Sequence, residues 1–308
     1  MTKRDLLSIA DLNKGDLERI IERASILKRD GSKPLLAGKT MAMIFEKPSL
    51  RTRVSFDLAV HQLGGHPLYL GRDEVGLGKR EPVADVARVL SRYVDAIVAR
   101  TFAHKTLEEL AAGASVPVIN ALSDAEHPCQ ALADLLTAQE RHGRLKGLAI
   151  AYVGDGSNNV AVSLALAAAS VGAHCTIASP QGYALPGPVL ERAKGLAQRS
   201  GATVRQVRRP EDAAKGADVV YTDVWVSMGQ EAETEERRRS FQGYQVTPDL
   251  MKLAKGGAIF MHPLPAHQGE EVAVGMLDHP QSAVFDQAEN RLHAQKAVLE
   301  LLAGGGKG

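Results

Sequence analysis

The pattern of apolar and polar positions switches between two periods along most of the chain. Short apolar runs typical of buried strands are followed by longer segments with apolar residues at helical spacing. Strands are predicted in the first half at 40–45, 67–70, 96–99 and 117–121, and helices at 53–63, 82–93, 104–112 and 124–142. This alternation is typical of a parallel sheet with helices on both faces.

The same pattern restarts at Gly147. Further strands are predicted at 148–153, 174–178, 203–207, 219–222 and 258–261, and helices at 161–171, 188–200, 231–242 and 290–302. We therefore predict an α/β protein with two doubly wound parallel-sheet domains linked by long helices. The first domain is expected over residues 1–146, with the C-terminal segment 286–308 packing back on it, and the second over 147–285.

Composition narrows the class of protein. The 308 residues are 44% hydrophobic, which excludes a disordered chain, and the 37 basic residues are balanced by 36 acidic ones, which argues against a nucleic-acid partner. No run of 18 apolar residues occurs, so no membrane partner is expected. The two cysteines, Cys129 and Cys175, fit neither a disulfide framework nor a metal site. We expect a cytoplasmic protein without a bound metal.

Candidate chemistry lies in the loops after strands, because doubly wound sheets bind ligands at the carboxyl ends of their strands. After the first strand, Ser49, Arg51, Thr52 and Arg53 surround the start of a helix, where free backbone N–H groups attract anions. An ordinary helix cap with solvated arginines would explain Ser49 alone. Two arginines around a hydroxyl favour a phosphate site.

Two further loops carry polar groups to the same sheet edge. Arg100 ends the third strand, and His127 and Gln130 open the helix after the fourth. A histidine near a helix N-terminus is expected to be neutral, able to donate a hydrogen bond to a carbonyl oxygen. Each residue alone would fit a surface charge or a packing residue. In the second half, the glycine turn at 154–156 lacks the third glycine of a dinucleotide fingerprint, because Asn159 stands there.

Seven short segments resemble the aspartate/ornithine carbamoyltransferase family, in order along nearly the whole chain. They are SLRTR at 49–53, RTF at 100–102, HPCQ at 127–130, VGDGSNN at 153–159, DVWVSMG at 223–229, HPLP at 262–265 and NR at 290–291. The resemblance is greatest to the ornithine branch, through Asp223 and the loop that follows it. It implies transfer of the carbamoyl group of carbamoyl phosphate to the δ-amine of L-ornithine, giving L-citrulline and phosphate without a cofactor, in arginine biosynthesis or catabolism.

The resemblance also implies residue roles. The implied catalytic residues are Arg51, Arg100 and His127. The implied carbamoyl-phosphate-binding residues are Ser49, Leu50, Arg51, Thr52, Arg100, His127, Gln130, Pro263, Leu264 and Arg291. The implied ornithine-binding residues are Asn159, Asp223, Ser227 and Met228.

Three departures from the family pattern leave alternatives open. Ornithine enzymes usually have threonine at the position of Leu50 and cysteine at that of Pro263, whereas aspartate enzymes carry HPLP. The chain is therefore compatible with carbamoylation of another amine, such as aspartate or an N-acylated ornithine, or with a non-catalytic paralogue that binds carbamoyl phosphate. Where many ornithine enzymes have a glutamine that reaches a neighbouring subunit, Gly76 has no side chain. Lys79 resembles the lysine that aspartate enzymes lend to a neighbour, although a solvated loop lysine fits equally well. A lent lysine implies a homotrimer or a multiple of trimers.

Overall fold

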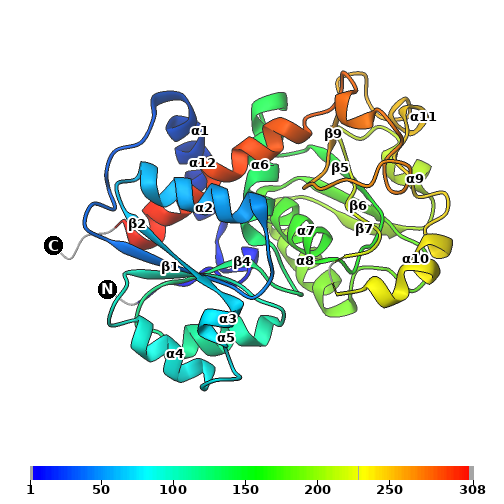
Figure 1. The fold of residues 1–308 in the computed structure, drawn as a ribbon. Helices are drawn as coiled ribbons and strands as arrows, with labels where there is room; N and C mark the ends of the chain where they lie inside the picture. Colours follow the sequence, from blue (N-terminus) through cyan, green and yellow to red (C-terminus); the bar gives the residue numbers. More distant parts are fainter. Residues whose placement is uncertain (1–2, 228, 305–308) are drawn as a thin grey trace. The chain divides into compact units, whose positions relative to one another are not determined.

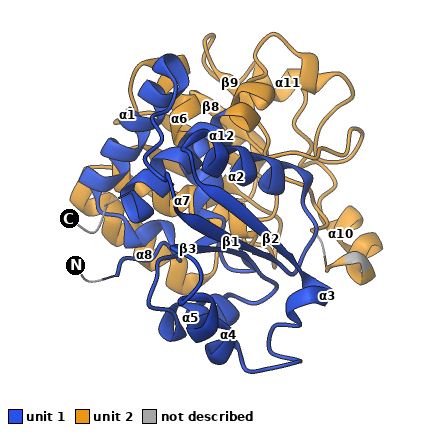
Figure 2. Cartoon of the chain, turned by 60° about the vertical axis from the view of Figure 1, so that its left-hand side comes forward, with its two compact units in different colours: residues 1–133, 290–308 blue, residues 134–289 orange. Residues whose placement is uncertain are grey.

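Two parallel sheets organise the chain, as the alternating pattern predicts. The structure is a computed structural model that describes residues 3–227 and 229–304. Its chain divides into two compact units, Met1–Ala133 with Asn290–Gly308, and Asp134–Glu289 (Figure 2). Each unit contains one sheet with every pair of neighbouring strands parallel. The predicted fold class is confirmed.

The first unit has strand order β2-β1-β3-β4. Its strands are β1 (Thr40–Phe45), β2 (His66–Gly71), β3 (Ala96–Arg100) and β4 (Val118–Leu122). Its helices are η1 (Ile9–Asp11), α1 (Lys14–Asp30), α2 (Leu50–Gln62), α3 (Arg72–Val75), α4 (Val83–Leu90) and α5 (His104–Gly113). Helices α1 and α2 lie on one face of the sheet and α4 and α5 on the other (Figure 1). The strand order reverses between β1 and β3, so their carboxyl ends form the ligand-binding edge.

The second unit has strand order β7-β6-β5-β8-β9. Its strands are β5 (Ala149–Val153), β6 (His174–Ala178), β7 (Val204–Val207), β8 (Val219–Tyr221) and β9 (Ile259–Met261). Its helices are α7 (Asn159–Val171), α8 (Gly187–Ser200), α9 (Pro210–Ala214), η2 (Glu231–Glu233), α10 (Thr234–Ser240), α11 (Pro248–Met251) and η3 (Met276–Asp278). Here the order reverses between β5 and β8, which places the corresponding edge at the ends of those strands.

Two long helices, α6 (Pro128–His142) and α12 (Val284–Ala303), run across the boundaries between the units in the sequence. The expected start of α6 at residue 124 is wrong. Proline has no N–H to donate and disfavours helical backbone in the residue before it, so the helix cannot extend upstream through Pro128. The carbonyl of His127 accepts the first helical hydrogen bonds, from the N–H groups of Gln130 and Ala131.

Other helix limits also differ from the prediction, most of all in the second half of the chain. The charged segment expected as one helix over 231–242 is a 3-10 turn, η2, followed by the short helix α10. The last helix begins six residues before the expected residue 290, with the N–H of Gln287 already donating to the carbonyl of Ala283 at 2.9 Å. Because of this early start, Arg291 lies in the second turn of the helix and not at its first residues.

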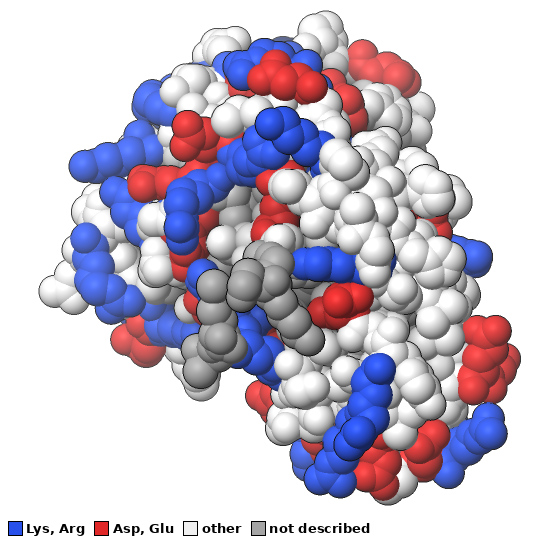
Figure 3. Space-filling view, turned by 90° about the vertical axis from the view of Figure 1, so that its left-hand side faces the viewer, with Lys and Arg blue, Asp and Glu red and all other residues white. Residues whose placement is uncertain are grey.

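In the described part of the chain, no helix has the length and apolar content needed to cross a membrane. On the face shown in Figure 3, lysine and arginine side chains are interspersed with aspartate and glutamate. That face therefore carries no broad field of one charge sign.

Close packing of α4 on α5 gives a test of the first unit. A Cβ at Gly113 would lie 2.9 Å from the carbonyl oxygen of Ala84 and 3.0 Å from the Cβ of Ala87. We expect Gly113→Ala to lower the free energy of unfolding by about 1–3 kcal/mol, because the helices would have to separate. Gly187→Ala is the control, since nothing lies within 4 Å there. Equal denaturant midpoints for both variants would contradict the close approach.

Candidate functional site

The start of α2 supplies an anion-binding helix end in the first unit. Ser49 caps the helix, its Oγ accepting a hydrogen bond from the N–H of Thr52 at 3.2 Å. The first N–H groups of a helix have no partner inside it, and the helix dipole makes this end positive. Leu50 is 75% exposed, so its side chain does not contribute to a buried site. Only its backbone N–H suits the predicted role.

Arginine side chains from three elements form a buried cationic group beside this helix end. Arg100 ends β3 in register with Phe45 of β1 and is 5% exposed. Arg291 of α12 is also buried and donates to Oγ1 of Thr52 at 2.6 Å. Burial, followed by the charges of Arg291 and Arg51, lowers the pKa of Arg100 to about 10. Arg100 therefore remains charged at neutral pH and is repelled by the charges of Arg291 and Arg51.

Two of these arginines have no acidic partner in the described part of the chain. Among the described residues, neither Arg51 nor Arg100 has an ion pair with a carboxylate, and Nε of Arg100 is buried without a hydrogen-bond partner. Burial also lowers the pKa of Arg51. Neighbouring arginines without a described carboxylate partner, as Arg51 and Arg100 are, suit a dianion such as phosphate.

His127 supplies a neutral donor to the same group. It is buried, and its pKa lies well below the usual value, first because of burial and then because of the charges of Arg291 and Arg100. This direction agrees with the neutral state expected from the sequence, and the arginines are a cause that sequence reasoning did not identify. Gln130 is buried in the first turn of the same helix.

Two basic residues singled out in the sequence lie elsewhere. The guanidinium of Arg53 lies over the ring of Tyr69, 3.8 Å from its centroid, and the side chain is exposed. Arg53 therefore stacks on an aromatic ring. This position contradicts the hypothesis from the sequence that both arginines of this loop contact a phosphate. Lys79 is exposed in the loop after α3, where its N–H donates to the carbonyl of Gly76.

A side-chain hydrogen bond joins the turn after β5 to the loop after β8 in the second unit. Asn158 caps α7 by accepting from the N–H of Val160 at 2.7 Å, and its Nδ2 donates to Oγ of Ser227 at 3.1 Å. The neighbouring Asn159 is the first residue of α7 and is half-buried. Sequence reasoning singled out Asn159 and missed Asn158, although an asparagine directly before a helix is a typical cap.

Asp223 follows β8 at the point where the strand order reverses. Its pKa is raised from the ordinary 3.8 to about 6, chiefly by burial and in smaller part by the nearby Glu271. His262 and hydrogen bonds from Val224 and Asn158 act in the opposite direction. Among the described residues, no lysine or arginine pairs with Asp223. A buried carboxylate without a cation is suited to a ligand that brings an ammonium group.

The loop after β9 contains Pro263 and Leu264 in a constrained form. Leu264 has a φ of 58°, a left-handed conformation that is unfavourable for a leucine. Its N–H donates to Nδ1 of the buried His262 at 2.9 Å, so the ring proton lies on Nε2, 3.1 Å from Oε1 of Glu271. Glu271 is buried and was missed, because an acidic pair in a loop carries no distinctive sequence signal.

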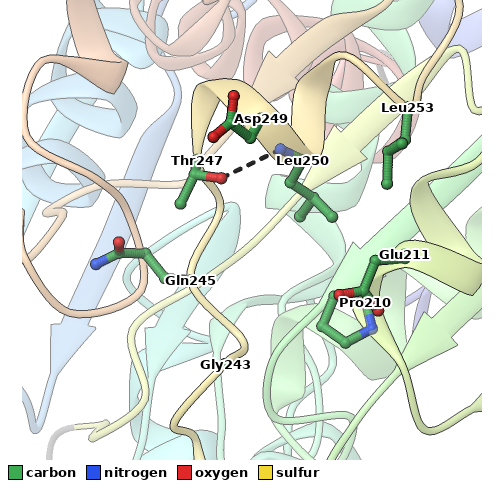
Figure 4. A pocket seen from close by; sticks show the side chains of 8 residues that line it. All are labelled: Pro210, Glu211, Gly243, Gln245, Thr247, Asp249, Leu250 and Leu253. Carbon is green, nitrogen blue, oxygen red and sulfur yellow. Dashed lines mark hydrogen bonds between the residues drawn. The ribbon is translucent and has the colours of Figure 1, made fainter.

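Two cavities lie in the second unit. One, of about 590 Å³, includes Ser227 and is lined by Val226, Ser227, Thr234, Arg238, His267, Gln268 and Glu270. The other, of about 440 Å³, is lined by the eight residues labelled in Figure 4 and contains none of the predicted site residues. There the hydroxyl of Thr247 is engaged with the N–H of Leu250, as the start of α11 requires.

One cluster has the composition of a metal site. His267, Glu270 and Glu271 bring their ligand atoms within 4.8 Å of one another. These carboxylates already take part in the loop structure, since Glu270 pairs with Arg238 at 2.7 Å and Glu271 accepts from His262 and from the N–H of His267. We assign the cluster to that internal network.

The fold and these groups define a class: a two-unit α/β protein that offers a dianion site in one unit and an ammonium-accepting carboxylate in the other. Comparison with known sequences makes the class specific. Residues 4–140 match the carbamoyl-phosphate-binding domain of aspartate/ornithine carbamoyltransferases, and residues 146–302 match their aspartate/ornithine-binding domain. The chain belongs to the aspartate/ornithine carbamoyltransferase family.

Individual relatives cover almost the whole chain. An ornithine carbamoyltransferase of Hyperthermus butylicus is 57% identical over 304 residues, 97% of each chain. The ornithine carbamoyltransferase structure from Pyrococcus furiosus has a TM-score of 0.95 at 54% identity, and the match covers 99% of each chain. The P. furiosus sequence described as anabolic is 54% identical over 306 residues, which are 98% of this chain and 97% of its own length. A structure of N-acetyl-L-ornithine transcarbamylase is more distant, at 31% identity and a TM-score of 0.89 over 97% of this chain and 99% of its own.

The raised pKa of Asp223 predicts that its ionised carboxylate lowers the free energy of unfolding of the ligand-free protein. The change from 3.8 to about 6 means that the folded state holds this proton more tightly, so stability falls as pH rises from about 4 to about 6. We expect Asp223→Asn to raise the free energy of unfolding by about 3 kcal/mol at pH 7 and by little at pH 4.

Urea unfolding at the two pH values measures this difference. Asp249→Asn is the control, because Asp249 is exposed and its pKa is lowered by Lys252, so its removal brings no gain. If the Asp223→Asn variant were no more stable than the parent at pH 7, the contacts of the Asp223 carboxylate would offset the cost of its burial.

Proposed function

We propose that this protein transfers the carbamoyl group of carbamoyl phosphate to the δ-amine of L-ornithine, giving L-citrulline and phosphate. The observation that carries the proposal is a pair of buried charges without an ion-pair partner among the described residues, the cation of Arg100 and the anion of Asp223. The first matches a phosphate dianion and the second an α-ammonium. Full-length similarity to ornithine carbamoyltransferases supports the same reaction.

The chemistry requires no protein nucleophile. The δ-amine attacks the carbonyl carbon, and because its free pKa is about 10, it must lose a proton first. Neutral His127 donates a hydrogen bond to the carbonyl oxygen, while Arg51 and Arg100 stabilise charge on the departing phosphate. Such preorganised donors are the main source of rate enhancement when a reaction consists of positioning and charge stabilisation.

The remaining assignments follow the family pattern. Ser49, the N–H of Leu50 and Thr52 hold the phosphate, and Arg291 orients Thr52 through their hydrogen bond. Gln130 and the carbonyl oxygens of Pro263 and Leu264 hold the carbamoyl amide. Asn159, Asp223 and Ser227 hold the amino-acid end of ornithine. Met228, assigned with them from the sequence, lies outside the described residues.

Charge favours ornithine over the alternative amines. An N-acylated ornithine has no α-ammonium and would leave the carboxylate of Asp223 without a partner. Aspartate brings a second carboxylate, which needs an additional cation. Arg238, the cationic residue that lines the cavity beside Ser227, is already paired with Glu270 and Glu235.

The proposal extends to assembly and to place of action. Leu50, Val54 and Leu58 form an exposed apolar stripe at i, i+4 and i+8 on α2, with exposures of 75%, 45% and 42%. Such a stripe supports association of copies into a trimer or a multiple of trimers, with Lys79 lent to a neighbour. The cytoplasm and arginine biosynthesis are the proposed setting. The cysteines Cys129 and Cys175, free and buried with each pKa raised to about 12 by burial, suit a reducing compartment.

A substrate comparison tests the reaction itself. With carbamoyl phosphate present, we expect citrulline from L-ornithine at a kcat/KM at least about a hundredfold above that for aspartate or N-acetylornithine, because each alternative leaves a buried charge unpaired. Colorimetric detection of ureido products measures all three reactions. Binding of carbamoyl phosphate without any turnover would instead identify a non-catalytic paralogue.

Removal of one guanidinium tests the phosphate site. We expect Arg51→Ala to lower kcat/KM for citrulline formation by at least about a hundredfold, or roughly 3 kcal/mol, while the chain stays folded. Arg88→Ala is the control, because Arg88 is an exposed arginine of the same unit that pairs with Asp85. Full activity of Arg51→Ala would remove Arg51 from the site.

A further inference from the structure

The segment 223–227 carries two of the proposed ornithine ligands, Asp223 and Ser227, yet it belongs to no helix or strand. Such a segment can present ligands accurately only if other contacts fix its backbone. One of those contacts comes from a residue that has no role in the reaction proposed above, Arg237 of α10.

Arg237 is 5% exposed, and its guanidinium donates hydrogen bonds to acceptors in three separate segments. Nη1 donates to the carbonyl oxygen of Trp225 at 3.1 Å, inside the 223–227 segment. The same nitrogen lies 2.7 Å from Oδ2 of Asp155 in the turn after β5. Nε donates to Glu233 at 2.8 Å. One guanidinium therefore joins the 223–227 segment to the turn that begins α7.

That turn is itself tied to a ligand. Oδ1 of Asp155 accepts from the N–H and from Oγ of Ser157, at 2.9 and 2.6 Å, and so fixes the approach to Asn158. Asn158 then donates to Oγ of Ser227. Contacts that begin at Arg237 thus reach Ser227 along two routes, through Trp225 in its own segment and through Asp155 and Asn158.

An aromatic ring lies against the guanidinium of this ion pair, and two further rings stack nearby in the sequence segments it joins. The guanidinium of Arg237 lies 5.1 Å from the ring centroid of Tyr183, and the rings of Trp225 and Phe241 stack at 5.9 Å with an interplanar angle of 17°. Side-chain exposures of 6% for Arg237 and 3% for Asp155 show that water does not screen the pair. Loss of either partner would leave a buried charge without compensation, and the segment would have to move.

We propose that Arg237 is a positioning residue for the amino-acid substrate: it fixes the Trp225 carbonyl against Asp155 and thereby sets Ser227 and Asp223 for ornithine. This inference rests on the proposed function. Arg237 itself does not bind substrate, so its removal should affect the ornithine side of the reaction and leave the carbamoyl-phosphate side intact.

Steady-state kinetics separate these effects. We expect Arg237→Gln to raise KM for ornithine by about 10- to 100-fold, the range expected when a ligand is displaced by about 1 Å. Calorimetric affinity for carbamoyl phosphate alone should stay within about twofold of the parent. Arg237→Lys should be intermediate, because one ammonium cannot replace a guanidinium that spans Asp155, Trp225 and Glu233. Arg239→Gln, an exposed position on the same helix, is the control.

Trp225 provides an independent readout, since it is the single tryptophan of the chain. Its fluorescence reports the 223–227 segment directly. Ornithine titrations should show the same rise in half-saturation as KM for Arg237→Gln, and the parent curve for Arg239→Gln.

A paired replacement keeps the test decisive if the single variant unfolds. Asp155→Leu with Arg237→Met removes both charges, which often preserves stability, but leaves no donor for the Trp225 carbonyl. We expect its KM for ornithine to remain raised. A parental KM in any folded Arg237 variant would overturn the inference. Absence of citrulline formation by the unaltered protein would overturn the proposed function instead.

Discussion

Buried charges that have no ion-pair partner among the described residues, Arg100 and Asp223, are the constraint on which both candidate sites depend. In the first unit, burial and mutual repulsion of guanidinium groups lower the pKa of Arg100; in the second, burial raises the pKa of Asp223. Each arrangement favours the state with a ligand of opposite charge bound over the state without it. Selectivity for a phosphate dianion and for an α-ammonium then follows from electrostatics, before any detail of shape.

The surrounding structure tolerates these charges because other buried charges are paired. Asp155 pairs with Arg237, and the ring of His262 connects Glu271 to the left-handed backbone at Leu264. These contacts fix loops that lie outside the strands of the two sheets. Proteins commonly hold strained or uncompensated groups at sites of function by such rigid support. In the proposed assignment, charges without an ion-pair partner bind the substrates, and paired charges hold the backbone that presents them.

Local sequence was a good guide to the elements and to the loops that carry chemistry. Apolar runs identified the strands of both sheets, and polar residues directly after them identified the ends of β1, β3 and β8. Errors arose where one residue overrode the pattern, as Pro128 does at the start of α6. The direction of a side chain also could not be predicted from the sequence. Arg51 and Arg53 are two residues apart, yet Arg51 is half-buried near Arg100, whereas Arg53 stacks on Tyr69.

The sequence by itself determined the fold class, the two-domain pattern and the family, because periodicity and short motifs are local properties that survive without coordinates. Tertiary structure alone decided which groups meet. Thr52 and Arg291 are 239 positions apart, and Asp155 and Arg237 are 82 apart, so only folding brings each pair into hydrogen-bond contact. Burial likewise exists only in the folded chain, and it is burial that keeps His127 neutral and raises the pKa of Asp223.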